Sequence, residues 1–349
     1  MTTSPVRIGL LGYGFGGRYF HAPLIAAAPG CALVGVVTQS ADRRAELDRD
    51  HPGVPAFGSL VDLAAAGADA VAISTPASTH IPLTIEALRL GLPVVCDKPF
   101  ALDAASAAGA VELAAEVGLP LTVYQNRRWD SDLLTVRKLI TDGRLGTVTR
   151  FESRFERFSW GDGPPTSGGG TRLDFGSHLV DQALTLFGAV DHVYAEVTTR
   201  QPDAPCDDDV FLALTHVSGV QSHLWGSWVQ GAPGPRFRVT GTLGTYVVAG
   251  SGGQEDALLA GRTPTTDGEG WGAEQERYWG ALHRGAANEV VPSERGRWDT
   301  FYPAFAAAVR GQGPVPVDPR DAIASLDVLD AAAASAVTGR TVAPRPTRP

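Results

Sequence analysis

The chain has 349 residues, of which 44% are hydrophobic and 19% are charged, and its formal net charge is −9. A single hydrophobic core rarely extends beyond about 250–300 residues, so this length predicts two domains. The acidic balance argues against a general nucleic-acid-binding protein, and no apolar run approaches the roughly 20 residues of a membrane span. Three isolated cysteines, without the spacing of a disulfide framework or a metal site, favour a cytoplasmic protein.

The first apolar strand is expected at residues 6–11, and a glycine-rich turn follows it at once. Residues 12–17 read GYGFGG, which fits the pattern G-x-G-x-x-G between a strand and a helix expected at residues 18–27. In this pattern Gly12 permits a tight turn, Gly14 lets the backbone approach a pyrophosphate, and Gly17 lets the helix pack closely on the strand. The helix would then face the phosphates of a dinucleotide, with a ligand-free glycine turn as the alternative.

The end of the second strand, expected at residues 32–37, bears on the choice between NAD and NADP. NAD-specific sites usually carry an acidic residue there for the ribose hydroxyls, and this sequence has none at that position. Ser40, Arg43 and Arg44 follow instead and offer contacts for the 2′-phosphate of NADP. The alternative is that both arginines belong to a solvated helix start. We therefore expect NADP as the preferred cofactor and NAD as the second possibility.

Strands and helices alternate up to about residue 125. Further strands are expected at residues 69–74, 93–96 and 121–124, and helices at 80–90 and 104–117. This order predicts a parallel sheet covered on both faces, which binds its ligands beyond the carboxyl ends of the strands. The segments that follow strand ends, and are therefore expected at the ligand cleft, are residues 12–17, 38–40, 75–80, 97–99 and 125–126.

One strand ends in VVCDKPF, residues 94–100, where Lys98 immediately precedes a proline. Proline has no N–H to donate, so the strand cannot continue past it inside a sheet. Lys98 is either a solvated strand end or a cation directed into the cleft. Its place at the carboxyl edge of a parallel sheet favours the second interpretation.

From about residue 127 the pattern changes, and strand-like segments dominate after one helix expected at residues 133–142. The strands are expected at residues 147–158, 193–200, 210–215, 221–228 and 236–240, with lengths and alternation typical of an antiparallel sheet. The predicted fold class is therefore α/β. An N-terminal Rossmann domain with a doubly wound parallel sheet (1–125) precedes a C-terminal α/β domain (126–349) with an open, mostly antiparallel sheet. Residues 343–349 are expected to be a frayed tail.

A helix expected at residues 172–187 carries Asp174, His178 and Asp181 on one face, because positions i, i+4 and i+7 lie in line. This stripe is an exposed polar face, a metal site or an acid–base group. No further His or Cys stands at ligand spacing, which disfavours a metal. The glycines at residues 168–170 permit a close backbone approach and favour acid–base chemistry, with His178 titrating near neutral pH.

Five segments together resemble the Gfo/Idh/MocA oxidoreductases, and more narrowly their NADP-preferring scyllo-inositol dehydrogenase-like branch. They are GLLGYGFGGRYFHAPLI (9–25), STPASTH (74–80), CDKPF (96–100), YQNRRWDSD (124–132) and GGGTRLDFGSHLVDQALTLFG (168–188). The resemblance implies that Lys98 reaches both the nicotinamide ribose and the substrate, and that His178 of the Asp174–His178 pair donates or accepts the proton. Asp97 stands where many members have Glu. Gln39 stands where close relatives often carry Arg, which weakens the case for NADP.

The resemblance implies an NAD(P)-dependent enzyme that moves a hydride between nicotinamide C4 and a secondary alcohol or ketone of a cyclic polyol or sugar, such as an inositol. The alternatives are a keto-sugar reductase of deoxysugar biosynthesis and a non-catalytic regulator that senses dinucleotides. We expect no metal, no nucleic acid and no membrane partner. A homodimer or homotetramer is expected to form through the C-terminal sheet, which the family often uses for oligomer contacts.

The expected site residues fall into three groups. The catalytic residues are Lys98, Asp174 and His178. The cofactor-binding residues are Gly12, Gly14, Phe15, Gly17, Thr38, Ser40, Arg43, Arg44, Thr75, Pro76, His80, Asp97, Lys98 and Asn126. The substrate-binding residues are Lys98, Asn126, Arg128, Asp174 and His178, with Arg127 as a further polar contact. Trp160, Trp225, Trp228 and Trp271 are candidates for stacking on a sugar, with core or interface packing as the alternative.

Overall fold

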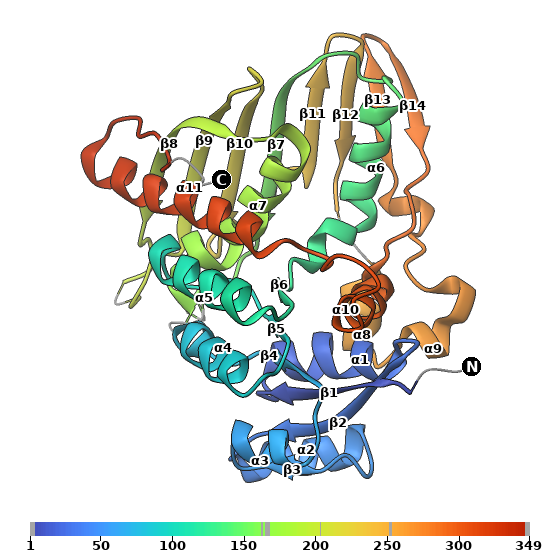
Figure 1. Ribbon diagram of the computed structural model, residues 1–349. Coiled ribbons are helices and arrows are strands. Elements are labelled where there is room, and N and C mark those ends of the chain that lie inside the picture. Colours follow the sequence, from blue (N-terminus) through green and yellow to red (C-terminus); the bar gives the residue numbers. More distant parts are fainter. Residues whose placement is uncertain (1–3, 162, 165–167, 203, 251–252, 346–349) are drawn as a thin grey trace.

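The computed structural model contains two β-sheets, one formed by each half of the chain, with helices packed on and between them (Figure 1). The structure describes residues 4–161, 163–164, 168–202, 204–250 and 253–345. No helix within these ranges combines the length and the apolar character that a membrane span requires.

The first sheet is parallel and has the strand order β3–β2–β1–β4–β5–β6. Its strands are β1 (Val6–Leu11), β2 (Cys31–Val37), β3 (Ala56–Phe57), β4 (Ala70–Ile73), β5 (Val94–Cys96) and β6 (Leu121–Val123). This order is that of a doubly wound dinucleotide-binding sheet. All residues of β4, β5 and β6 are buried, as strands covered on both faces require. The predicted Rossmann sheet is therefore confirmed.

The helices of this half are α1 (Ala22–Ala27), α2 (Ala41–Asp50), α3 (Leu60–Ala65), α4 (His80–Arg89) and α5 (Ala104–Val117). The helix expected directly after the glycine turn begins instead as a π-helical turn, η1 (Gly17–His21). Sequence patterns predicted neither this turn nor the two-residue strand β3, because both are too short for a periodic signal. Short π-helical turns often occur at functional sites, and this one brings His21 into the interior.

The second sheet has the order β14–β13–β12–β11–β7–β10–β9–β8, and only the β7–β10 pair among its described strands is parallel. Its strands are β7 (Val148–Glu156), β8 (Val190–Thr198), β9 (Asp209–His216), β10 (Gln221–Ser227), β11 (Phe237–Gly241), β12 (Gly244–Val248), β13 (Gly280–Arg284) and β14 (Ala287–Val291). Buried residues alternate with half-exposed ones along β9, as in a sheet with one covered face. The predicted mostly antiparallel sheet is confirmed.

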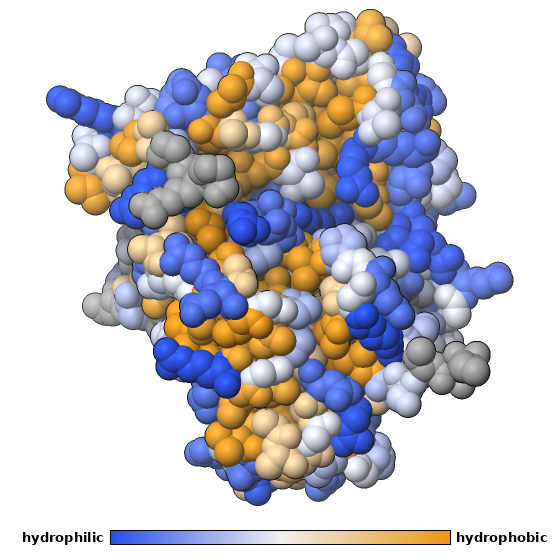
Figure 2. All heavy atoms as spheres, viewed as in Figure 1, coloured by the Kyte–Doolittle hydropathy of each residue, from blue (hydrophilic) through white to orange (hydrophobic). Residues whose placement is uncertain are grey.

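Helices cover one face of the second sheet and leave the other face open (Figure 1). The covering helices are α6 (Ser131–Thr141), α7 (Gly170–Phe187) and α11 (Pro319–Thr338). Two shorter helices, α8 (Gly253–Leu259) and α9 (Pro264–Asp267), lie beside the first half of the chain. On the face shown in Figure 2, hydrophilic side chains gather where the two halves meet.

After the second sheet the chain returns to the first half, which sequence patterns beyond about residue 240 did not predict. In α10 (Phe301–Val309), Phe301, Tyr302 and Phe305 are buried in the same apolar cluster as Ile8 and Leu10 of β1. The chain after the second sheet therefore completes the core beneath the glycine turn. This packing places the hydroxyl of Tyr302 close to the end of η1.

Candidate active site

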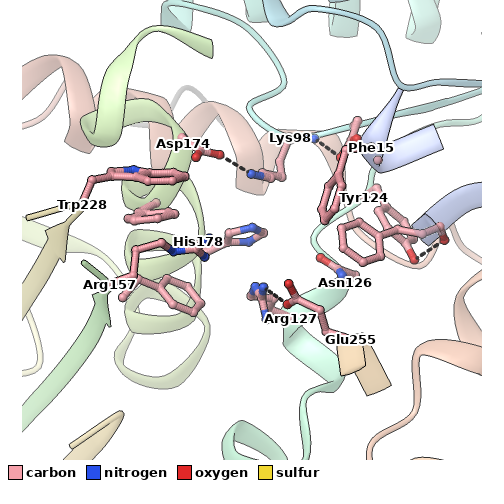
Figure 3. A pocket seen from close by; sticks show the side chains of 15 residues that line it. Phe15, Lys98, Tyr124, Asn126, Arg127, Arg157, Asp174, His178, Trp228 and Glu255 are labelled. Carbon is pink, nitrogen blue, oxygen red and sulfur yellow. Dashed lines mark hydrogen bonds and ion pairs between the residues drawn. The ribbon is translucent and has the colours of Figure 1, made fainter. Parts of the chain in front are cut away.

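A cavity of about 320 Å³ lies between the glycine turn, the end of β5 and helix α7 (Figure 3). Its lining residues come from both halves of the chain. They are Phe15, Gly16, Phe20, Asp97, Lys98, Tyr124, Asn126, Arg127, Phe155, Arg157, Asp174, Phe175, His178, Trp228 and Glu255. The cavity thus joins the carboxyl edge of the parallel sheet to the helix-covered face of the second sheet.

The three residues expected to be catalytic all line this cavity. The Nζ of Lys98, which follows β5, lies 2.6 Å from Oδ1 of Asp174 on α7. His178 stands one helical turn after Asp174, so its ring faces the same space (Figure 3). A strand end from one half and a helix from the other therefore place a cation, a carboxylate and an imidazole around one volume.

His178 is buried, and its Nδ1 makes no hydrogen bond with any residue that the structure describes. Burial lowers the pKa of His178 well below its ordinary value, and the cations of Lys98, Arg127 and Arg236 lower it further. The imidazole is therefore neutral near physiological pH. A neutral imidazole has one free lone pair, so His178 is equipped to accept a proton.

Asp97 is held as a fixed carboxylate at the edge of the cavity. Its Oδ1 accepts a hydrogen bond of 2.8 Å from the backbone N–H of Lys98, and its Oδ2 accepts one of 2.8 Å from Ser74 Oγ. The Nε2 of His21 lies 3.3 Å from the same Oδ2. Burial alone would raise the pKa of Asp97, but His21 and Lys98 hold it well below its usual range.

Sequence reasoning missed His21 and its partner Tyr302. The Nδ1 of His21 lies 2.6 Å from the Tyr302 hydroxyl, although the two residues are 281 positions apart. Both side chains are almost completely buried. Only the packing of α10 against η1 joins them, so no local pattern could have predicted the pair.

The two arginines that follow β6 point in different directions. Arg127 lines the cavity and forms a 2.6 Å ion pair with Glu255. Arg128 instead forms ion pairs of 2.6 Å with Asp181 and 2.9 Å with Asp321, and it does not line the cavity. The structure thus brings Arg127, rather than the expected substrate ligand Arg128, to the site.

Asp181, the third member of the polar stripe on α7, is buried in its ion pair with Arg128 and does not line the cavity. Removing one partner of such a buried pair leaves the other charge uncompensated, so the two residues support the fold together. The stripe therefore divides into two residues at the cavity and one that anchors α7 to the chain after β6.

Of the four tryptophans considered for sugar stacking, Trp228 lines the cavity. Its ring stacks on Phe175 at a centroid distance of 5.1 Å, and the guanidinium of Arg157 lies 4.7 Å above it. Trp271 is buried in the core, Trp160 is exposed, and Trp225 packs with Phe211 and Arg154. The wall of the cavity is thus aromatic next to Trp228.

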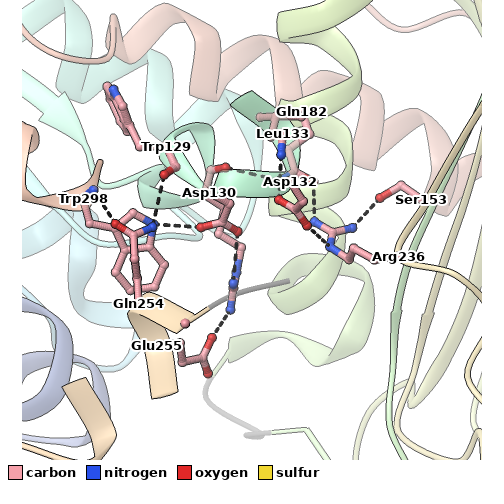
Figure 4. Close-up of polar contacts among 12 residues, drawn as sticks. Trp129, Asp130, Asp132, Leu133, Ser153, Gln182, Arg236, Gln254, Glu255 and Trp298 are labelled. Atoms are coloured by element: carbon pink, nitrogen blue, oxygen red, sulfur yellow. Dashed lines mark hydrogen bonds and ion pairs between the residues drawn. The ribbon is translucent and has the colours of Figure 1, made fainter. Parts of the chain in front are cut away.

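A buried polar network surrounds Arg236 and Asp132 (Figure 4). Arg236 donates hydrogen bonds to Ser153 (2.6 Å) and Gln182 (2.7 Å), and its guanidinium lies 4.0 Å above the ring of Phe155. Its Nε is 3.5 Å from Asp132, whose pKa burial raises to about 7. These contacts fix Phe155 against the cavity, and no sequence motif indicated them.

A second cavity of about 340 Å³ lies beside the glycine turn, and Phe15 borders both cavities. It is lined by Tyr13, Gly14, Phe15, Arg18, Tyr19, Ser40, Asp42, Arg43 and Glu46. Arg44 does not line it, because its Nε donates to the carbonyl of Thr38 (3.1 Å). The Oγ of Ser40 accepts from the backbone N–H of Arg43 at 3.4 Å and so caps α2.

At three glycines of the turn a side chain would lie against neighbouring protein atoms. Gly12 has a φ of +92°, and a Cβ on it would lie 2.3 Å from the carbonyl oxygen of Ser74. A Cβ on Gly17 would lie 2.2 Å from the carbonyl oxygen of Gly12, and one on Gly16 would lie 2.9 Å from Oδ2 of Asp97. Gly12 and Gly17 therefore allow the tight turn and the close packing of the helix start on β1 that the sequence pattern predicts.

The other residues expected to contact the cofactor differ in how accessible they are. Asn126 lines the first cavity, and Thr75 and Pro76 lie at the partly exposed end of β4. Thr38 is buried directly after β2. His80 is 1% exposed, and both of its ring nitrogens contact backbone carbonyls, so its side chain is not available to a cofactor. No cluster of three potential metal ligands occurs in the described part of the chain.

Comparisons with known proteins match this architecture over most of the chain. The family profile described as "Oxidoreductase family, NAD-binding Rossmann fold" matches residues 6–125, and the profile "GFO/IDH/MocA C-terminal domain" matches residues 133–247.

Two curated relatives and one solved structure are similar over almost their whole length. "Scyllo-inositol 2-dehydrogenase (NADP(+)) IolW" of Bacillus subtilis is 32% identical, covering 97% of this chain and 95% of the relative. The oxidoreductase YdgJ of Escherichia coli is 36% identical, covering 93% and 94%. The structure of the oxidoreductase yvaA from Bacillus subtilis superposes with a TM-score of 0.90 at 31% identity, covering 98% and 99%. The chain therefore belongs to the Gfo/Idh/MocA family and is an NAD(P)-dependent oxidoreductase that acts on CH–OH groups.

Proposed function

We propose that this oxidoreductase interconverts a secondary alcohol and a ketone on a cyclic polyol or sugar of the inositol type. The observation that carries the proposal is the 2.6 Å contact between Lys98 and Asp174, with His178 in the same cavity and the dinucleotide turn beside it. The aromatic wall at Trp228 and the polar side chain of Asn126 suit a ring that carries several hydroxyl groups. The named relative that acts on scyllo-inositol supports this substrate class.

Lys98, Asp174 and His178 each have a separate role in the oxidation of the alcohol. A bound nicotinamide would supply the acceptor for the hydride of the substrate carbon. His178 accepts the hydroxyl proton, since its ring is neutral and faces the cavity. The ammonium of Lys98 stabilises the negative charge that develops on the oxygen, and Asp174 orients both Lys98 and a neighbouring hydroxyl. Reduction of the ketone uses the same groups in reverse.

Ser40 and Arg43 support NADP as the preferred cofactor. Both line the second cavity, where the adenosine end of a dinucleotide would lie beyond β2. No acidic residue stands at the tip of β2 to bind both hydroxyls of an unphosphorylated ribose. Of the two arginines expected at a 2′-phosphate, the geometry thus favours Arg43 over Arg44, whose Nε bonds to Thr38.

We also propose that a second copy of the chain covers the open face of the second sheet. Helices cover the opposite face only (Figure 1). On the open side, Phe211 and Trp225 pack at 5.2 Å with Arg154 at 3.9 Å above the Trp225 ring, and none of the three is fully buried. Aromatic and arginine side chains are enriched in protein interfaces.

Replacing either Lys98 or His178 by alanine is expected to lower turnover well over tenfold, because general acid–base groups contribute roughly 10²–10⁴-fold. The assay is the reduction of NAD+ and NADP+ with a panel of inositols and common sugars. Lys138→Ala is the matched control, since Lys138 is exposed on α6 and pairs with Asp142. Near-normal turnover in both site variants would refute the assignment.

The rate of alcohol oxidation is expected to stay constant as the pH falls through about 6.5, the ordinary pKa of histidine. The lowered pKa of His178 keeps the ring neutral there, so its proton-accepting form is lost only at lower pH. The measurement is kcat/KM for the alcohol against pH. An acidic limb centred at or above the ordinary histidine value would contradict this electrostatic account.

NADPH is expected to bind more tightly than NADH in fluorescence titrations. Arg43→Ala should weaken NADPH binding roughly tenfold or more, since a hydrogen bond to a charged group contributes about 1.5–3 kcal/mol, and should leave NADH binding nearly unchanged. Arg49→Ala serves as the control, because Arg49 is exposed at the far end of the same helix. Tighter binding of NADH by more than about tenfold would overturn the Ser40–Arg43 assignment.

The oligomer proposal predicts that light scattering gives a mass of two or four chains. Trp225→Glu should shift the protein toward the monomer, because it places a charge in the aromatic cluster. The mass of a single chain for the wild-type protein at micromolar concentration would contradict the proposal.

A further inference from the structure

His80 is a buried histidine that does not line the cavity, and its hydrogen-bond partners indicate its protonation state. His80 is the first residue of α4 and is 1% exposed. Its Nδ1 lies 2.8 Å from the carbonyl oxygen of Pro99, and its Nε2 lies 2.8 Å from the carbonyl oxygen of Thr75. A carbonyl oxygen only accepts hydrogen bonds, whereas a neutral imidazole has only one N–H. Both contacts are hydrogen bonds only when both ring nitrogens carry a proton.

The surroundings of His80 compensate the resulting positive charge. Cys96 and Asp97, at the end of β5, both favour the charged form of the ring, and Asp97 supplies the negative charge. The nearby cation of Lys98 is turned toward Asp174. Burial alone would lower the pKa of His80, but these neighbours and the Pro99 carbonyl raise it to about 9. The ring thus carries its charge next to a carboxylate, as buried cations require.

The two carbonyls belong to the two loops that meet at the cavity. Thr75 follows β4 in the loop expected to contact the cofactor, and Pro99 directly follows Lys98. On the other side of Lys98, its own backbone N–H is held by Asp97 at 2.8 Å. The main chain of Lys98 is therefore fixed from both sides, by a carboxylate before it and by the His80 ring after it.

We propose that His80 is a positioning residue which, as a buried imidazolium, ties the loop after β4 to the Lys98–Pro99 segment and so holds Lys98 within reach of Asp174. We call the two contacts of the His80 ring with the carbonyls of Thr75 and Pro99 the His80 clamp. Neither the clamp nor the charge of the ring depends on the identity of the substrate. The effect on turnover rests on the proposed function, because it assumes that Lys98 stabilises the alkoxide.

The clamp couples the stability of the fold to pH. The pKa of His80 is raised in the folded protein above the value of about 6.5 expected in the unfolded chain. Its contribution to stability is therefore fully present below about pH 6.5 and is lost as the pH rises through about 9. Above that range one ring nitrogen loses its proton and faces a carbonyl oxygen without a hydrogen bond.

The direct test is ¹⁵N NMR of the histidine-labelled wild-type protein at about pH 7.5, well below the raised pKa of His80. His80 should show two protonated ring nitrogens. His216 is the internal control, since its Nδ1 faces the Gly188 carbonyl but its Nε2 faces the Ser222 hydroxyl, which can donate. A neutral ring satisfies both of those partners, so His216 should have one protonated nitrogen. One unprotonated nitrogen on His80 at this pH would overturn the proposal.

The second test is His80→Gln, whose single amide nitrogen cannot occupy the positions of both ring nitrogens. We expect kcat to fall about tenfold or more through displacement of Lys98, while the KM for substrate changes much less. The loss of unfolding free energy between about pH 6.5 and 9 should be clearly smaller in His80→Gln than in the wild type and in His216→Gln. An unchanged kcat in folded His80→Gln, or the same pH dependence as the wild type, would contradict the clamp. If no substrate turns over in the wild type, the NMR and unfolding measurements still decide the matter.

Discussion

The ion pair between Lys98 and Asp174 is the contact on which the site depends, since it joins the two halves of the chain at the reacting groups. Lys98 ends a strand of the parallel sheet, and Asp174 lies in the first turns of the helix that covers the second sheet. Both side chains are only about one-fifth exposed, so the cost of removing the two charges from water offsets much of their attraction. Its importance is geometric, because the cavity exists only when these two elements meet.

Around this pair, burial and neighbouring charges shift the pKa values of His178 and Asp97 and so fix their protonation states. Burial and three cations keep His178 neutral, whereas Asp97 stays ionised because His21 and Lys98 stand beside it. A proton acceptor and a fixed anion therefore coexist within one cavity. Pairs of titratable groups whose environments separate their pKa values in this way are typical of acid–base sites.

The sequence predicted the parts of the site that depend on local pattern. The glycine turn, Lys98 at a strand end, and Asp174 and His178 on one helix face each follow from a motif or a periodicity. The contacts of His21 with Tyr302 and of Arg236 with Gln182 were not predictable, because they join segments separated by 281 and 54 positions. Arg127 lines the cavity whereas Arg128 pairs with Asp181, and this difference likewise depends on which carboxylates the fold brings near each arginine.

The buried histidines show why residue type alone does not assign a role. Each has the same ring, yet the number of acceptors facing it decides its charge: two carbonyls at His80, one carbonyl and one hydroxyl at His216. Asp97, whose charge favours the charged form of His80, also borders the glycine turn. Its Oδ2 would lie 2.9 Å from a Cβ on Gly16. Through Ser74 and the backbone N–H of Lys98, the Asp97 carboxylate links the end of β4 to the Lys98 segment.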